Sequence, residues 1–201
     1  MRVSIFSLGR ILTAPASVFA ELSGDDPNPW QVFFGLTLWL LVCPPVFALL
    51  GTTRFGWLLG VEPLLLPTSV VLGISAAYLA TLIFGFFSTV MISRWMTDTY
   101  AADASLGRHF ALISVVGAPL AVGSIVHLYP HAFINVLTLI PALIWSLYLL
   151  YRGVPAVLGT GPERGMLMAS SIVGYLLVAW VSLIGITVVL WSSGYGPRLG
   201  I

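Results

Sequence analysis

The sequence predicts an all-α integral membrane protein, with five transmembrane helices and an N-terminal interfacial amphipathic helix. Of its 201 residues, 59% are hydrophobic and only 7% are charged, whereas about 25% of residues are charged in soluble domains. The mean hydropathy is +1.04. Crossing a bilayer core of about 30 Å takes roughly 20 apolar residues. Segments of suitable length, free of Asp, Glu, Lys, Arg and His, are residues 30–50, 67–93, 110–126, 133–151 and 166–191.

The first 24 residues are predicted to form a helix on the membrane surface. Thr13 can cap a helix that has Pro15 in its first turn, and Val18, Phe19 and Leu22 would share its apolar face. Such a helix lies in the plane of the headgroups with its apolar face toward the acyl chains. A signal peptide is the less favoured alternative, because Arg10 and Pro15 interrupt the apolar run that it needs.

The first span carries Pro44 and Pro45 in its second half. Two prolines remove two amide donors and leave the carbonyls of Leu40 and Leu41 without their usual partners, which predicts a kink. The favoured interpretation is a kink that fits the bundle, and the alternative is a hinge or a break that binds a solute. Cys43 is the only cysteine, so no intrachain disulfide is possible and a small buried side chain is expected.

Small residues recur at every fourth position of the second span. They let helix backbones approach closely in membranes. Four residues turn an ideal helix by about 400°, so the row drifts by about 40° per step and no straight partner contacts all of it. We therefore predict a helix-packing surface that two helices could share, and Ser170 with Gly174 offers a shorter match in the fifth span. This small-residue row comprises Ser69, Gly73, Ala77, Thr81, Gly85 and Thr89.

The third span is the shortest and is interrupted by Gly117, Pro119 and Gly123, so its length also allows a re-entrant hairpin. His109, beside Arg108, is predicted to lie at the membrane interface.

Polar residues near the start of the fourth span are few. His127 and His131 have a spacing that would place two imidazoles on one helical face, but Pro130 weakens that geometry and no carboxylate or cysteine is near in sequence. We therefore predict no metal site. Asn135 is expected to make a helix-packing hydrogen bond.

The fourth span is predicted to end in an interfacial turn. Tyr148, Tyr151 and Arg152 would lie at the headgroups, and Gly153 with Pro155 would stop the helix. Residues 154–159 would then lie along the interface. Thr160 and Glu163 have the spacing of a capping box, with Pro162 in the first turn of the next helix and Arg164 in water.

Arginine positions predict the orientation. Cytoplasmic loops carry an excess of basic residues, so the N-terminus is expected in the cytoplasm and the C-terminus outside. The side with more arginines holds Arg2, Arg10, Arg94, Arg108, Arg152 and Arg164, and the other holds Arg54 and Arg198.

No motif for catalysis or nucleotide binding is present, and the seven acidic residues are scattered through the loops. The net charge of +1 provides no field for nucleic acid. Ionisable residues within the bilayer are the usual mark of intramembrane chemistry, and the predicted spans contain none. We therefore predict a non-enzymatic protein without cofactor or metal.

Three segments resemble the bacterial branch of the Yip1 family of polytopic membrane proteins. They are LYLLYRGVPAVLGTGPERG at 147–165, GRHFALISVVGAP at 107–119 and APASVFAEL at 14–22. The resemblance implies a single Yip1-like transmembrane domain over residues 1–201, with five helices, no cofactor and action through partners.

Two functions remain open. The favoured one is an accessory subunit or organiser of the bacterial inner membrane that acts on the bilayer and on other membrane proteins by lateral helix packing, in a larger complex or a homo-oligomer. The alternative is a transporter or channel for a small neutral or apolar solute. A dry bundle with exposed small-residue grooves would favour association, and a cavity reaching the middle of the membrane would favour transport.

Overall fold

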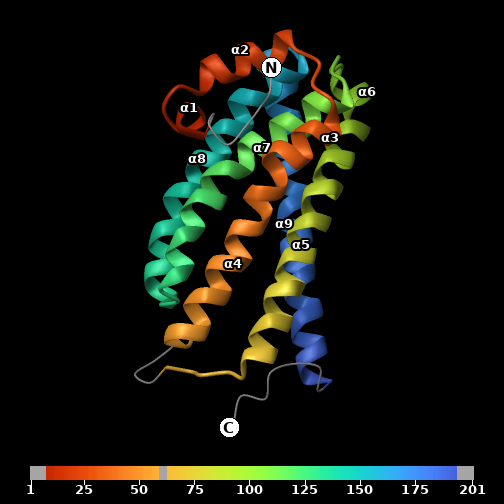
Figure 1. Cartoon of the computed structure of the whole chain (residues 1–201). Coiled ribbons are helices and arrows are strands. Elements are labelled where there is room, and N and C mark those ends of the chain that lie inside the picture. Colours follow the sequence, from red (N-terminus) through yellow and green to blue (C-terminus); the bar gives the residue numbers. More distant parts are fainter. Residues whose placement is uncertain (1–7, 59–62, 194–201) are drawn as a thin grey trace.

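Five long helices form the body of the protein in a computed structural model, which describes residues 8–58 and 63–193 (Figure 1). Each is long and apolar enough to cross a membrane. All five predicted spans are confirmed, and most extend beyond their predicted ends. The helices are Pro29–Phe55, Thr68–Trp95, Leu106–Leu128, Ala132–Leu158 and Pro162–Ser192.

The first and third of these helices change their winding along their length. The first comprises α3 (Pro29–Val32), the π-helical segment η2 (Phe33–Thr37) and α4 (Leu38–Phe55). The third comprises α7 (Leu106–Gly123) and the 3-10 segment η3 (Ser124–Leu128), so this span is continuous and the re-entrant hairpin is excluded. The others are α5 (Thr68–Trp95), α8 (Ala132–Leu158) and α9 (Pro162–Ser192).

The short helices gather at one end of the bundle. These are α1 (Leu8–Thr13), α2 (Pro15–Gly24) and α6 (Thr97–Tyr100), and they define the N-terminal end, at the top of Figure 1. The opposite end, here called the far end, holds the connections from α4 to α5 and from η3 to α8. Among the arginines of the described residues, only Arg54 lies at the far end, in the last turn of α4.

The core lies toward the N-terminal end. α7 packs most extensively on α8, while α4 packs on α5, η3 and α7. Leu112, Leu149 and Leu150 are all at most 2% exposed. Aromatic rings continue this core between η2, α5 and α7, with centroids of Phe33 and Phe87 at 5.1 Å and of Phe86 and Phe110 at 5.4 Å.

The apolar face of α2 is correctly predicted, but what packs against this face differs from the expectation. Val18, Phe19 and Leu22 are buried because α2 packs on α7 and α8. A Cβ atom placed on Gly153 of α8 would lie 3.1 Å from Cε1 of Phe19, so the absence of a side chain there admits the ring. Protein, rather than the acyl chains predicted from sequence, covers this face.

The start of α2 also differs from the expectation. Thr13 belongs to α1, where its hydroxyl donates to the carbonyl of Gly9 at 2.8 Å. The residue before α2 is Ala14, which has no capping side chain, while Pro15 occupies the first turn as predicted. An exposed ion pair between Arg10 and Glu21 joins α1 to α2. The hydrogen bond and negative charge of Glu21 raise the pKa of Arg10 above its ordinary value, so this residue stays cationic.

The linker between α2 and α3 is held against the start of α7. Asn28 caps α3 by accepting the amides of Trp30 at 2.9 Å and Gln31 at 3.3 Å. A Cβ atom on Gly107 would lie 1.7 Å from the carbonyl oxygen of Pro27, a separation that no residue but glycine allows. Nε of Arg108 donates to the carbonyl of Asp25 at 2.9 Å. The linker therefore has a defined path over the bundle.

Candidate functional site

The small-residue row of α5 points largely away from the rest of the chain. Ser69, Gly73 and Ala77 are exposed, and burial increases along the row until Thr89 is buried. Cβ atoms placed on Gly73 or Gly85 would meet no heavy atom within 4 Å. No other helix of the described chain therefore packs closely on these glycines, because α5 buries a different face. Packing by a second chain remains a prediction.

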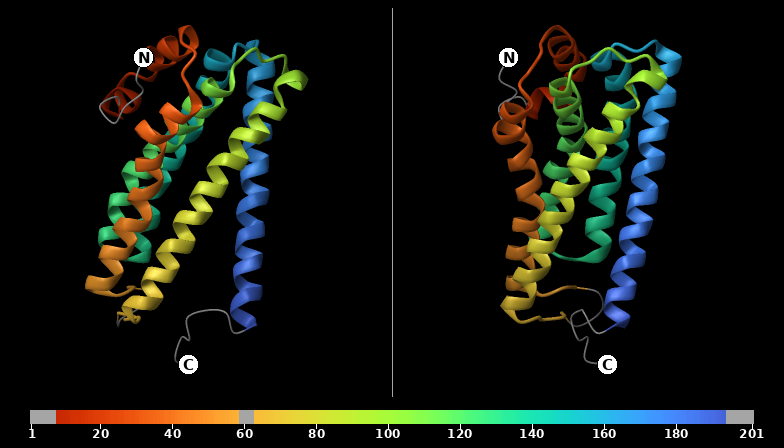
Figure 2. Two further views of the ribbon diagram at one scale, coloured as in Figure 1. Left: turned by 45° about the vertical axis from the view of Figure 1, so that its right-hand side comes forward. Right: turned by 90° about the vertical axis from the view of Figure 1, so that its right-hand side faces the viewer.

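The half of α9 nearer the far end also lacks packing partners within the described chain. All of residues 181–193 are exposed, and Trp180 is 63% exposed. The buried residues of α9 are Gly165, Met168, Ala169 and Ile172, all in its first three turns. Figure 2 shows α9, in blue, close to α5 at the N-terminal end and diverging from it toward the far end. This half of α9 therefore offers a long apolar surface within the membrane.

Hydroxyl contacts fix the first half of α9. The hydroxyl oxygens of Tyr100 and Ser171 lie 2.6 Å apart, and those of Tyr151 and Ser170 lie 3.0 Å apart. Tyr100 belongs to α6 and Tyr151 to α8. The helix is thus attached at one end and free of the bundle at the other.

The first part of the predicted interfacial turn belongs to α8. The helix does not stop at Gly153 and Pro155 but continues to Leu158, and Gly159 ends it at a φ of +71°. A proline in a helix interior costs about 3 kcal/mol. Val154, Val157 and Leu158 are fully buried, and such side chains each stabilise by about 1.5–3 kcal/mol, so packing outweighs the proline.

The predicted capping box is also wrong. Gly161 precedes α9 and no side chain caps the helix, although Pro162 is in the first turn as predicted. Thr160 lies one residue too early, and its buried hydroxyl makes no hydrogen bond with the described residues. Glu163 and Arg164 are exposed in this first turn, and Tyr148 and Arg152 are exposed on α8.

Pro44 and Pro45 lie buried within α4, which continues on both sides of them. The favoured interpretation, prolines that fit the bundle, agrees with this burial. Pro44 also lines a cavity described below.

His109 is buried within the bundle, and its predicted position at the membrane interface remains a prediction. Because α7 begins at Leu106, this residue lies one turn inside the helix and is fully buried. Its Nδ1 lies 2.8 Å from Oγ of Ser93 on α5. The hydrogen bond joins two spans and gives His109 a packing role.

At the far end, Asn135 joins η3 to α8. Its carbonyl oxygen pairs with Nδ1 of His127, and its amide nitrogen donates to the carbonyl oxygens of His131 at 2.9 Å and Tyr129 at 3.2 Å. The predicted packing hydrogen bond of Asn135 is therefore made with the preceding turn. Across residues 8–58 and 63–193, no three His, Cys, Asp or Glu residues are grouped to hold a metal ion.

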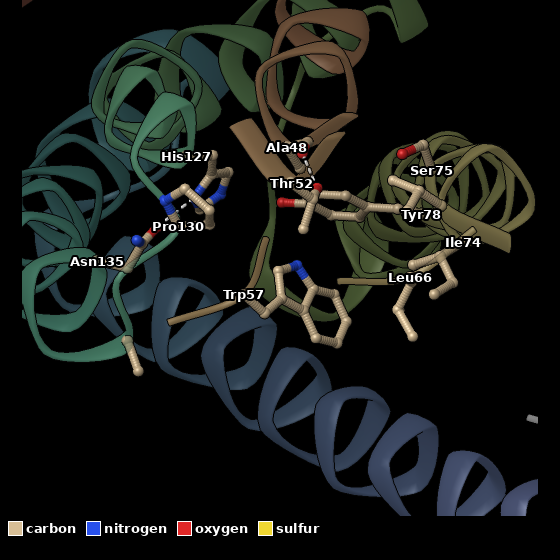
Figure 3. Close-up of a pocket in the computed structure, with 12 residues that line it drawn as sticks. Ala48, Thr52, Trp57, Leu66, Ile74, Ser75, Tyr78, His127, Pro130 and Asn135 are labelled. Atoms are coloured by element: carbon tan, nitrogen blue, oxygen red, sulfur yellow. Dashed lines mark hydrogen bonds between the residues drawn. The ribbon is translucent and has the colours of Figure 1, made fainter. Parts of the chain in front are cut away.

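Two cavities lie between the helices, and they meet at Tyr78 and His127. The outer one, near the far end, has a volume of about 380 Å³ and lies between α4, α5, η3 and α8. Its lining includes Thr52, Trp57 and Ser75, and Figure 3 shows Tyr78 reaching across it from α5. The inner one measures about 280 Å³ and extends to Phe86, Ile113 and Ser114.

Backbone hydrogen bonds hold the far-end connections beside the outer cavity. Trp57 and Leu64 exchange two, each of 2.9 Å, and the amide of Leu58 donates to the carbonyl of Pro130 at 3.0 Å. Gly51 permits the closest approach, because its Cβ atom would lie 2.1 Å from the carbonyl oxygen of His127. The position of η3, and with it His127, is therefore set by α4.

Sequence reasoning missed this site. Ser75 and Tyr78 are three residues apart, so they share a face of α5, and polar residues on one face of a span are a signal that could have found it. The partner residues on α4, η3 and α8 come from distant parts of the chain, and no local pattern joins them.

A family model described as the Yip1 domain matches residues 9–183. The chain belongs to the Yip1 family. This Yip1 chain is 31% identical over 164 residues to the inner membrane protein YohC of Escherichia coli K12, a match that covers 81% of this chain and 83% of the relative. The same figures hold for YohC of Escherichia coli O6:H1. No solved structure matches this Yip1 protein.

Proposed function

We propose that this Yip1 protein is a non-enzymatic accessory subunit or organiser of the inner membrane, which holds other membrane proteins by lateral helix packing. Its relatives in Escherichia coli are inner membrane proteins by name. The N-terminal end, which carries five arginines among the described residues, faces the cytoplasm under this proposal, in line with the distribution of basic residues.

The observation that carries the proposal is the exposed part of the small-residue row of α5. Association of helices in lipid is driven by packing and hydrogen bonds rather than by hydrophobicity, because lipid tails are equally apolar. A surface for a partner helix therefore needs a shape that admits close contact. The small-residue row of α5 has this shape, with open space at Gly73 and Gly85, and α9 diverges beside it.

The test replaces Gly85 by Leu in the full chain and identifies the proteins that co-purify in mild detergent. A Cβ atom built at this position has no heavy atom of the described residues within 4 Å, so the fold should keep its stability. A partner backbone at this position would be displaced, at a cost of about 1–3 kcal/mol, so we expect co-purification to fall about fivefold or more.

Phe84→Leu is the matched control. Phe84 is adjacent, 71% exposed and outside the row, so its replacement alters the lipid-facing surface and leaves the row intact. Equal recovery of partners from Gly85→Leu and Phe84→Leu would show that the row contacts lipid and would rule out association through α5.

A second candidate is a transporter or channel for a small neutral solute, and the inner cavity favours it. This cavity reaches Phe86 and Ile113, but buried Phe33 and Phe110 lie on its N-terminal side. Permeation would thus require this aromatic cluster to rearrange. If this function holds, vesicles containing the purified protein should take up glycerol faster than protein-free vesicles. Equal rates of uptake would rule out the transporter or channel.

A further inference from the structure

The outer cavity contains hydroxyl groups without protein partners. Ser75 is 9% exposed and Tyr78 is half-buried. Neither hydroxyl makes a hydrogen bond with the described residues, whereas the neighbouring Thr52 donates to the carbonyl of Ala48. Neither oxygen is sealed off by protein atoms, so both are available to form hydrogen bonds with a molecule in the outer cavity. The outer cavity therefore favours a molecule that forms hydrogen bonds with these two groups.

Apart from Tyr78, which lines both cavities, the residues with hydroxyl groups in the inner cavity are already paired. Oγ1 of Thr37 lies 2.5 Å from Oγ of Ser114, and Ser114 donates to the carbonyl of Phe110 at 2.7 Å. Ser124 donates to the carbonyl of Ala121 at 2.6 Å. The rest of its lining is mostly aliphatic and aromatic. The inner cavity therefore suits an apolar group.

Among the residues that the structure describes, no Asp, Glu, Lys or Arg lines either cavity. A charged group in so apolar a site would need an opposite charge, so the ligand is uncharged. The volumes of about 380 and 280 Å³ compare with the range of about 300–1,000 Å³ for small-molecule sites, which also combine an apolar lining with a few polar groups.

We propose that the two cavities together bind one uncharged single-chain amphiphile. Its hydroxyl, amide or carbonyl head forms hydrogen bonds with Ser75 and Tyr78 in the outer cavity. Its apolar chain extends past Tyr78 and His127, which line both cavities, and fills the inner cavity. This site belongs to a single chain and does not depend on lateral association.

The probe is dodecanol with a diazirine in the middle of its chain, added to the purified full-length protein in lipid nanodiscs and cross-linked by light. Mass spectrometry should locate the label on residues of the inner cavity, such as Leu82 and Leu120. Unlabelled dodecanol should compete, and ionised dodecanoate should compete at least tenfold less well because of its charge.

Two variants examine the two halves of the site. Gly117 lines the inner cavity, and no heavy atom lies within 4 Å of a Cβ atom built there. Gly117→Leu should therefore fill the cavity without a backbone clash and reduce labelling more than tenfold. Tyr78→Phe keeps the shape but removes one hydrogen bond, and should weaken dodecanol binding about three- to tenfold.

Gly174→Leu is the matched control. It is a glycine within a helix, also without a heavy atom within 4 Å of its Cβ position, but it lies on α9 outside both cavities. The extent of labelling of this variant should equal that of the native protein. Labelling spread over the lipid-facing side of α9 and unchanged by Gly117→Leu would mean partition into the bilayer only, and would overturn the proposal. Competition by dodecane as strong as by dodecanol would overturn the role of Ser75 and Tyr78.

Discussion

At the scale of single residues, glycines decide where the backbone of one element touches another. Gly51 and Gly107 leave no room for a Cβ atom beside a neighbouring backbone, whereas Gly73, Gly85 and Gly174 have open space around them. The sequence does not separate these two groups, because both occur within apolar helices. This is why the α5 row was predicted as a helix-packing surface without saying which helices would cover it, while the tight contacts at Gly51 and Gly107 were not predicted.

Replacing Gly51 by Ala should destabilise the protein, because its Cβ atom would lie 2.1 Å from the carbonyl oxygen of His127. Backbone must shift to admit it, at a cost of about 1–3 kcal/mol. Gly73→Ala is the control and should be neutral or stabilising by up to about 1 kcal/mol. Thermal unfolding of both variants in detergent measures the difference. Equal midpoints for the two variants would contradict the contact between α4 and η3.

At the scale of elements, the hydropathy pattern locates the helices well. It predicts less well where each helix ends and what packs on its apolar face. The face of α2 formed by Val18, Phe19 and Leu22 is correctly identified, but a periodic pattern does not distinguish burial in lipid from burial against α7 and α8. Likewise, Gly153 and Pro155 favour a helix end locally, while burial of Val154 and Val157 stabilises continuation. Both errors arise from tertiary contacts that a local window does not contain.

The packing of α2 can be tested by replacing Phe19 and Leu22 together with Glu. Two carboxylates cannot remain buried against α7 and α8 without partners, so α2 should detach and the N-terminal residues should become sensitive to protease. The five spans should remain inserted. Limited proteolysis of membrane vesicles measures this, with Ala20→Glu as the control on the exposed face of the same helix. Unchanged protection in the double variant would argue against the observed packing of α2.

At the scale of the whole molecule, the all-α class, the number of spans and the family are confirmed. The class and the number of spans are predictable because length and hydropathy within each span suffice for them, and the family is predictable from the sequence segments at 14–22, 107–119 and 147–165. The candidate ligand site could not be predicted in this way, because its residues belong to separate elements and meet only after folding. These residues include Ser75, Tyr78, Thr52 and His127. The orientation depends on the arginine distribution and remains a prediction.

Reporter fusions test that orientation. A reporter after Ile201 should be active outside the cytoplasm, and one inserted between Asp98 and Asp103 should be active inside, because an odd number of spans separates the two positions. Alkaline phosphatase and green fluorescent protein fusions provide the two measurements. Activity of both on the same side would be incompatible with the five-span arrangement.

The attachment of α9 by its first three turns has a consequence for biogenesis. Chains fold from the N-terminus during synthesis, and the earlier helices supply most of the buried side chains. Met168, Ala169 and Ile172 complete that contribution. The bundle can therefore close as soon as this short stretch leaves the ribosome, while residues 173–192 are still being delivered to the membrane. A chain ending at Ile172, held on the ribosome by an added linker long enough to span the exit tunnel, should have an assembled core.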